Sequence, residues 1–243
     1  MVACDELHGD PGGVTMGSVA LVVGGYLLGA LPFTLALAAA SGVNPSSEPD
    51  LHIALWHRVG RLPASIAAVV DIAKGAFPVL IGFGFGLPVG VVALSGAAAV
   101  AGQMWPPMRD CGEKGNSTGV GVLLTLLPLY RVYLPLVSLA FFAVGALLRY
   151  VTLSADRRAG GGDDHPLALA LPLGMLLGFG LAPLLSWLSG GPHGISVGLL
   201  LVVALIALRR ITAGLSRDLS VGAKAGPVLL RRLFFDQSLT GRG

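Results

Sequence analysis

The chain has 243 residues, of which 54% are hydrophobic and only 12% are charged, and its mean hydropathy is +0.79. Soluble domains usually carry about 25% charged residues, so this composition excludes an ordinary soluble protein and indicates a membrane protein. The net charge of +3 is expected to reflect membrane orientation and does not argue for a nucleic-acid partner.

The chain begins with an acidic leader, residues 1–15, which holds Asp5, Glu6 and Asp10 but no Lys or Arg. A cleaved signal peptide would begin with basic residues, so the apolar run that follows is predicted to stay in the membrane. Met16 is an alternative start, and translation from it would leave out the leader.

Seven membrane-spanning helices are predicted after the leader. Five apolar runs approach or exceed the roughly 20 residues that a bilayer core requires. Thr118–Arg149 is too long for one span and is interrupted by prolines and Arg131, so it is divided into two helices. The predicted spans are Val14–Ala40, Leu62–Leu80, Pro88–Trp105, Thr118–Leu129, Val132–Tyr150, Pro166–Trp187 and Gly194–Leu208.

Charge placement supports seven spans with the N-terminus outside and the C-terminus in the cytoplasm. In this topology all but Arg131 of the 16 Lys and Arg residues fall on or near the cytoplasmic side, as the positive-inside rule expects. A six-span alternative would move five of these cations outside. We therefore predict an all-α polytopic protein with a seven-helix membrane domain at 16–211 and a basic cytoplasmic tail at 212–243.

Two further patterns concern packing. The spacing of Gly25 and Gly29, Gly86 and Gly90, and Gly174 and Gly178 is typical of closely packed membrane helices. In the tail, residues 227–235 are predicted to lie on the membrane surface, with Arg231 and Arg232 facing lipid headgroups.

The most informative stretch is the charged, glycine-flanked hairpin at residues 102–119, which lies between two apolar runs. Lys114 lies between Gly112 and Gly115 and just before Ser117 and Thr118, where the next helix should begin. Backbone amides at a helix start, small residues, hydroxyls and a cation together suit a phosphate. A nucleotide-binding P-loop is excluded, because its Lys is followed directly by Ser or Thr after a strand.

Two other cytoplasmic segments hold polar residues. Asp71 and Lys74 are three residues apart, so they share a helical face and can pair; either they form a structural ion pair, or Asp71 positions Lys74 to hold an anion. The first loop, Ser41–Leu62, carries two histidines, which are expected to be solvated, and the candidate phosphate ligands Ser47, Arg58 and Arg61.

Metal or cofactor sites are not predicted. Cys4 and Cys111 are expected on opposite sides of the membrane, and the chain has no metal-ligand spacing.

Three blocks of this sequence resemble the PlsY family of acyl-phosphate:glycerol-3-phosphate acyltransferases from bacterial membranes. Tyr26-Leu-Leu-Gly-Ala-Leu-Pro-Phe33 is similar to the family's Tyr-Leu-Leu-Gly-Ser-Ile-Pro-Phe. Asp71-Ile-Ala-Lys-Gly75 is similar to Asp-Leu-Leu-Lys-Gly. Residues 102–106 with 112–119 are similar to Gly-His-Ile-Phe-Pro and Gly-Gly-Lys-Gly-Val-Ala-Thr-Gly.

The chain also departs from the family pattern. The family's Ser is Ala30, its His is Gln103, and the glycine before its lysine is Glu113. Its expected arginine falls at Cys111, with Arg109 nearby, and only Ser47 matches the glycine- and asparagine-rich stretch expected at residues 46–54.

The resemblance implies transfer of a fatty acyl group from acyl phosphate to glycerol 3-phosphate at the cytoplasmic face of the bacterial inner membrane, without a cofactor. The residues assigned to catalysis are Lys114, Ser117 and Thr118. Those assigned to the two phosphates are Gly112, Gly115, Arg109, Arg58, Arg61, Lys74, Asp71, Ser47 and Gln103. A catalytically silent lipid-binding or scaffold relative, and a small transporter, are the alternatives.

Overall fold

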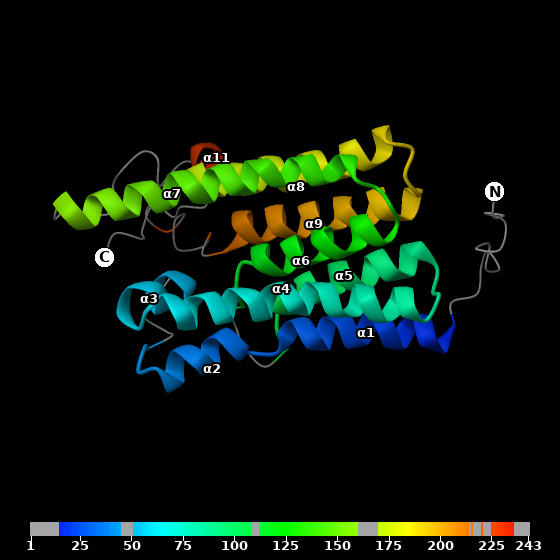
Figure 1. The fold of residues 1–243 in the computed structure, drawn as a ribbon, viewed down its shortest axis with the longest axis horizontal. Helices are drawn as coiled ribbons and strands as arrows, with labels where there is room; N and C mark the ends of the chain where they lie inside the picture. The colour runs from blue at the N-terminus through cyan, green and yellow to red at the C-terminus, as the bar shows by residue number, and fades with distance from the viewer. Residues whose placement is uncertain are drawn as a thin grey trace. The chain divides into compact units, whose positions relative to one another are not determined.

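The computed structural model describes residues 15–44, 51–107, 112–159, 170–213, 215, 220 and 225–235, and all regular secondary structure in these residues is helical (Figure 1). The chain divides into two compact units. Unit 1 comprises Met1–Arg131 and Pro192–Gly198, and unit 2 comprises Val132–Gly191 and Leu199–Gly243. The start of one helix, α9 (His193–Thr212), therefore belongs to unit 1 and its remainder to unit 2.

The described residues of unit 1 form six further helices. They are α1 (Met16–Ala30), α2 (Phe33–Ala40), α3 (Leu51–Arg58), α4 (Arg61–Gly84), α5 (Val89–Met104) and α6 (Asn116–Leu129). The first predicted span is thus broken in two at Leu31 and Pro32. Proline has no N–H to donate and disfavours helical geometry in the residue before it, so the break follows from the sequence.

Close backbone contacts hold unit 1 together. A Cβ at Gly25 or Gly29 on α1 would overlap the main-chain carbonyl of Ser95 or Ala99 on α5, so the predicted role of this pair is confirmed. The same prediction is wrong for Gly86, which lies in the turn before α5 with φ of 64° and where a Cβ would meet nothing within 4 Å. Gly90 does take part in a close contact, because a Cβ at Gly194, near the start of α9, would lie 2.9 Å from the Gly90 Cα and N atoms.

The α3 helix lies inside the stretch that was expected to be a loop. Its apolar residues Leu51, Ala54 and Leu55 are buried in a cluster that also contains Ala38 of α2 and Ala64 of α4. Spacing of three and four residues places the apolar side chains on one face, and burial of that face stabilises a helix of only eight residues.

Unit 2 contains the 3-10 helix η2 (Leu134–Ser138), α7 (Leu139–Ala159), α8 (Ala170–Leu188), most of α9, and α11 (Ala225–Phe235). Helices α7 and α8 pack through Phe142 and Phe179, whose rings meet edge to face at a centroid distance of 4.7 Å. A Cβ at Gly174 would overlap the Phe141 carbonyl, and one at Gly178 would overlap the Phe142 ring. The predicted packing role of this glycine pair is confirmed.

The α11 helix lies in the predicted tail. Arg231 is exposed, but Arg232 is buried and donates a hydrogen bond to the Ala213 carbonyl. The prediction that both arginines face lipid headgroups is therefore wrong for Arg232. Burial requires its charged group to find protein acceptors, and the main-chain carbonyl just after α9 provides one.

Within the part of the chain that the structure describes, four helical stretches are long and apolar enough to cross a membrane: Met16–Ala40, Arg61–Gly84, Leu171–Leu188 and His193–Thr212. Three shorter apolar helices, at Val89–Met104, Asn116–Leu129 and Leu134–Leu148, coincide with the remaining predicted spans. A polytopic all-α fold is confirmed for the described residues, while the seven-span topology and its orientation stay predictions.

Candidate active site

The three sequence blocks meet in unit 1. The Tyr26 hydroxyl donates to the Trp105 carbonyl at 2.5 Å, which ties the first block to the third. Lys74 Nζ donates to the Leu31 carbonyl at 2.7 Å, which ties the second block to the first. Since residues far apart in the chain converge at one place, the blocks form a single structural site.

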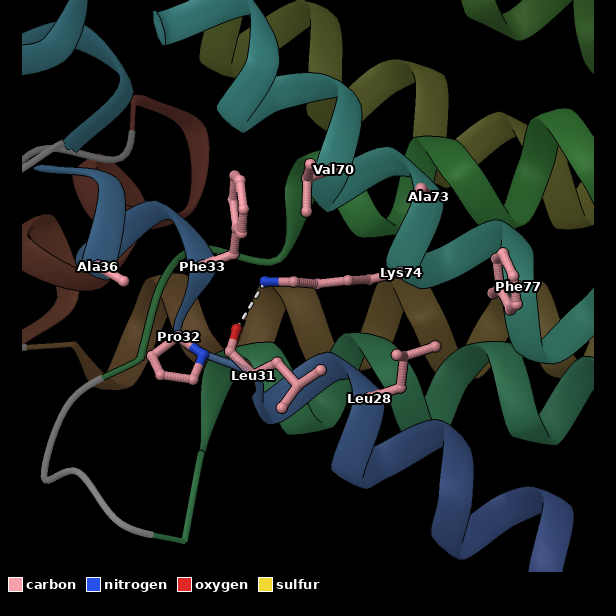
Figure 2. A pocket seen from close by; sticks show the side chains of 9 residues that line it. All are labelled: Leu28, Leu31, Pro32, Phe33, Ala36, Val70, Ala73, Lys74 and Phe77. Carbon is pink, nitrogen blue, oxygen red and sulfur yellow. Dashed lines mark hydrogen bonds between the residues drawn. The ribbon is translucent and has the colours of Figure 1, made fainter.

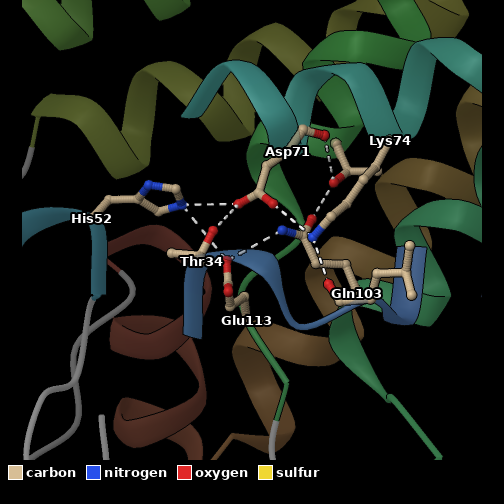
Figure 3. A network of polar contacts seen from close by, with 8 residues as sticks. Thr34, His52, Asp71, Lys74, Gln103 and Glu113 are labelled. Atoms are coloured by element: carbon tan, nitrogen blue, oxygen red, sulfur yellow. Dashed lines mark hydrogen bonds and ion pairs between the residues drawn. The ribbon is translucent and has the colours of Figure 1, made fainter. Parts of the chain in front are cut away.

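Asp71 and Lys74 lie at the centre of this site, on one face of α4 (Figure 3). Asp71 Oδ1 is 2.8 Å from Lys74 Nζ, and the side chains are 0% and 5% exposed. The Thr34 hydroxyl of α2 donates to Asp71 Oδ2 at 3.1 Å. The predicted ion pair is confirmed, and its burial makes each partner necessary to the other.

Lys74 also lines a groove between α4 and the break separating α1 from α2 (Figure 2). The groove has a volume of about 370 Å³. Its other lining residues are all apolar: Leu28, Leu31, Pro32, Phe33, Ala36, Val70, Ala73 and Phe77. An ammonium at the wall of an apolar groove suits a ligand with an anionic head and a hydrocarbon chain. Lys74 can therefore form the ion pair with Asp71 and also bind an anion, so the two predicted roles are compatible.

His52 and Glu113 complete the network, and sequence reasoning missed their meeting. His52 Nε2 of α3 is 3.1 Å from Asp71 Oδ2 and 3.6 Å from Glu113 Oε2. Burial disfavours the charged imidazole, but hydrogen bonds and charge attraction from Asp71 and Glu113 outweigh it and raise the pKa of His52 from 6.5 to about 10. The apolar face of α3 was the available signal. It indicates that part of Ser41–Leu62 forms a helix packed against the protein, which would bring His52 out of the solvated loop and into the site.

The donor atoms of His52, Asp71 and Glu113 lie within 4.8 Å of one another, which makes this the group in the described residues that could hold a metal ion. With His52 protonated, however, the two carboxylates are balanced by His52 and Lys74. These four side chains together are therefore electrically neutral without an ion.

Gln103 and Thr118 connect α5, α6 and α4. Gln103 Nε2 donates to Glu113 Oε2 at 3.2 Å, and the fully buried Thr118 hydroxyl contacts both the Gln103 side-chain oxygen and, at 3.0 Å, the Asp71 carbonyl. These contacts suit a role for Thr118 in joining helices around Asp71. They also connect Gln103 to Asp71 through the Thr118 hydroxyl.

The Lys114 turn leads directly into α6, which begins at Asn116, two residues before the predicted start. Gly115 caps the helix with φ of 71°, a conformation that glycine adopts without strain. The first-turn amides, including those of Ser117 and Thr118, have no acceptor within the helix. Lys114 is thus held next to a helix N-terminus, where an anion is favoured.

Gly112 and Glu113 fix the other side of this turn. A Cβ at Gly112 would overlap the Gln103 and Met104 carbonyls, and the Glu113 amide donates to the Gln103 carbonyl at 3.0 Å. The turn therefore runs back tightly along the end of α5.

The remaining predicted phosphate ligands are Arg58, Arg61, Ser47 and Arg109. Arg58 and Arg61, at the end of α3 and the start of α4, are exposed, and the Arg61 guanidinium lies 5.7 Å from the centre of the Trp56 ring. Ser47 and Arg109 lie outside the described residues.

Comparison with known proteins identifies the family. Residues 19–219 match the family model for glycerol-3-phosphate acyltransferase. A glycerol-3-phosphate acyltransferase from Roseiflexus sp. (strain RS-1) is 35% identical over 166 residues, which cover 67% of this chain and 80% of the relative. One from Methylobacillus flagellatus is 33% identical over 180 residues, which cover 71% and 89%.

The fold matches as well. Crystal structures of PlsY, an integral membrane glycerol 3-phosphate acyltransferase, align with TM-scores of 0.63 for the glycerol 3-phosphate form and 0.62 for the lysophosphatidic acid form. Each covers 85% of this chain and 93% of the solved chain at 23% identity. The family model spans both units, and the three blocks that resemble PlsY converge around Asp71 and Lys74. This chain therefore belongs to the glycerol-3-phosphate acyltransferase family, a family of membrane enzymes.

Proposed function

We propose that this chain transfers a fatty acyl group from acyl phosphate to the 1-hydroxyl of glycerol 3-phosphate and so forms lysophosphatidate. The hydroxyl oxygen attacks the acyl carbonyl carbon, and a new C–O ester bond forms. The bond from that carbon to the phosphate oxygen breaks, and inorganic phosphate leaves. The hydroxyl proton passes to a phosphate oxygen of one of the substrates.

One observation carries the proposal: the three blocks converge where an apolar groove meets a buried cation. The third block also contains the Lys114 turn. Acyl phosphate is already activated, so orientation and neutralisation of phosphate charge can supply much of the rate enhancement. Both needs are met by fixed cations and helix-start amides.

Each phosphate has its own proposed ligands. Lys114, the first-turn amides of α6 and the Ser117 hydroxyl bind one of them. Lys74 has three N–H donors, two of which bond to Asp71 and the Leu31 carbonyl, so the third can bind the other phosphate. Arg58 and Arg61 are proposed to assist from the ends of α3 and α4.

The groove beside Lys74 is proposed to hold the first part of the acyl chain. Its apolar lining (Figure 2) suits a hydrocarbon chain, and the Lys74 ammonium among these residues would bind the phosphate head. In this arrangement the donor enters from the hydrocarbon region, while glycerol 3-phosphate arrives from water.

The proposed setting is the inner membrane of a bacterium, with seven spans, the N-terminus outside and the site at the cytoplasmic face. This orientation gives the Lys114 turn access to the cytoplasmic pool of glycerol 3-phosphate. Accessibility labelling of a cysteine introduced at Ser117 in inverted and right-side-out vesicles tests it.

The decisive experiment measures acyl transfer by the purified protein in lipid nanodiscs, with acyl phosphate and labelled glycerol 3-phosphate. Replacing Lys114 with Ala should lower kcat/KM about 100- to 1,000-fold, the loss typical of removing one group that stabilises developing charge. Arg231→Ala, an exposed change on α11, is the matched control and should retain activity.

Wild-type protein that binds glycerol 3-phosphate saturably but forms no lysophosphatidate would instead indicate a silent relative. Departures such as Ala30 and Gln103 motivate that alternative, and the same nanodisc preparation distinguishes it.

A further inference from the structure

Glu113 poses an electrostatic problem for the proposed phosphate site. It directly precedes Lys114, and the family pattern has a glycine at this position. An unbalanced carboxylate beside a dianionic phosphate would repel it, and the repulsion would be strong in a partly buried site. The fold must either move this charge away from the phosphate or neutralise it.

The structure does both through contacts that involve Glu113 and Gln103, two of the departures from the family pattern. The Glu113 amide is bonded to the Gln103 carbonyl at 3.0 Å, and its carboxylate accepts from the Gln103 side chain at 3.2 Å. The same carboxylate oxygen lies 3.6 Å from His52 Nε2. Figure 3 shows this carboxylate directed toward His52 and Gln103.

His52 is itself held in place. Its Nε2 also lies 3.1 Å from Asp71 Oδ2, and the helix that carries it is fixed by the buried residues Leu51, Ala54 and Leu55. The imidazole side chain is 29% exposed, so it is largely removed from solvent. Its position between two carboxylates favours the protonated, positively charged form.

The charges therefore balance only with His52 present. Asp71 and Glu113 contribute two negative charges, and Lys74 and His52 contribute two positive ones. Loss of His52 would leave a net negative charge next to the Lys114 turn, although none of the phosphate ligands themselves would have changed.

We propose that His52 is a positioning residue that neutralises Glu113 and holds it back, so that a phosphate dianion can bind at Lys114. This inference rests on the proposed function, because the phosphate is that of an acyl-transfer substrate. It also pairs two departures from the family pattern, since Glu113 and Gln103 replace the expected glycine and histidine and contact each other, while Glu113 also contacts His52.

The test is a double-mutant cycle in nanodiscs with wild type, His52→Ala, Glu113→Gln and the double variant. Loss of His52 should raise the KM for glycerol 3-phosphate about 10-fold, the expected order for one added charge near a dianion, with a smaller change in kcat. Glu113→Gln removes a negative charge and keeps the shape, so the KM should not rise above that of wild type. The double variant should return the KM to within about 2-fold of wild type, because no unbalanced carboxylate remains.

His57→Ala, an exposed change on the same helix, is the matched control and should leave the KM unaltered. His52→Gln gives a second route should the alanine variant fail to fold, because it keeps a hydrogen-bond donor but carries no charge. It should reproduce the raised KM. A purely structural role for His52 predicts a lower unfolding temperature and a lower kcat that Glu113→Gln does not rescue, and that result would overturn the inference.

Equilibrium binding of labelled glycerol 3-phosphate to the same variants separates this inference from the proposed function. Wild type that binds without turnover refutes acyl transfer, yet weaker binding by His52→Ala and its rescue in the double variant would still support the role of His52. Normal turnover in wild type with no rescue refutes only the role of His52.

Discussion

Buried charges in the two units are satisfied in different ways. In unit 1, Asp71 and Lys74 pair with each other at 2.8 Å, and Asp71 also contacts polar side chains from α2, α3 and α6. In unit 2, Arg210 Nη1 donates to the Pro172 and Leu233 carbonyls at 3.0 and 3.2 Å, and Arg232 donates to the Ala213 carbonyl.

This difference indicates different roles. A network of side chains can change its charge or its contacts when a ligand binds, whereas an arginine that bonds to main-chain carbonyls mainly anchors one helix to another. We therefore expect substitutions in the Asp71–Lys74 network of unit 1 to lower both stability and activity. Substitutions at the buried arginines of unit 2 should affect only the packing of α11.

The largest expected effect separates these roles directly. Asp71→Asn leaves the buried Lys74 ammonium without its counter-charge and should cost about 3–5 kcal/mol of unfolding free energy. Activity should fall about 10-fold or more as Lys74 shifts. Arg232→Gln should cost less, about 1.5–3 kcal/mol, and retain activity. SDS titration in detergent and the nanodisc assay measure both; equal losses of activity would contradict the division of roles.

Helix crossings provide an intermediate comparison. A Cβ at Gly75 of α4 would overlap the Thr118 carbonyl of α6, which cannot move without shifting the helix that follows Lys114. Gly75→Ala should therefore cost about 1–3 kcal/mol and also lower activity.

Two other glycines calibrate that result by the same measurements. Gly178→Ala in unit 2 would meet the Phe142 ring, so it should destabilise the α7–α8 packing while activity is retained. Gly84 lies in the same helix as Gly75 and has open space, so Gly84→Ala should be neutral or slightly stabilising. An unstable Gly84→Ala variant would show that the close contact is not the cause.

The most gradual expected effect is a pH dependence. Because the pKa of His52 is raised from 6.5 to about 10 in the folded state, its contribution to stability is complete below pH 6.5. It declines between pH 6.5 and 10 and is lost above pH 10. The difference in unfolding free energy between wild type and His52→Gln should shrink over this range. The difference between wild type and Arg232→Gln should stay constant, since arginine does not titrate there.

Much of the fold could be predicted from local sequence. Each predicted span overlaps apolar helical structure, although the first is broken in two at Pro32 and the fifth begins with the 3-10 helix η2. Length and hydropathy alone decide whether a segment can enter a bilayer. The pairing of Asp71 with Lys74 followed from helical spacing. The break at Pro32, the helix at Leu51–Arg58 and the burial of Arg232 were not predicted, although the first two have local signals.

Residue order alone establishes the membrane class, the positions of the apolar spans and the three blocks that carry the family resemblance. The contact of His52 with Glu113, the contact of Thr34 with Asp71 and the apolar groove beside Lys74 arise only from the folded structure. Helical periodicity is a property of neighbouring residues, so it can be read along the chain. Contacts such as that between Thr34 and Asp71, 37 residues apart, depend on which helices pack together, and that is set by the whole fold.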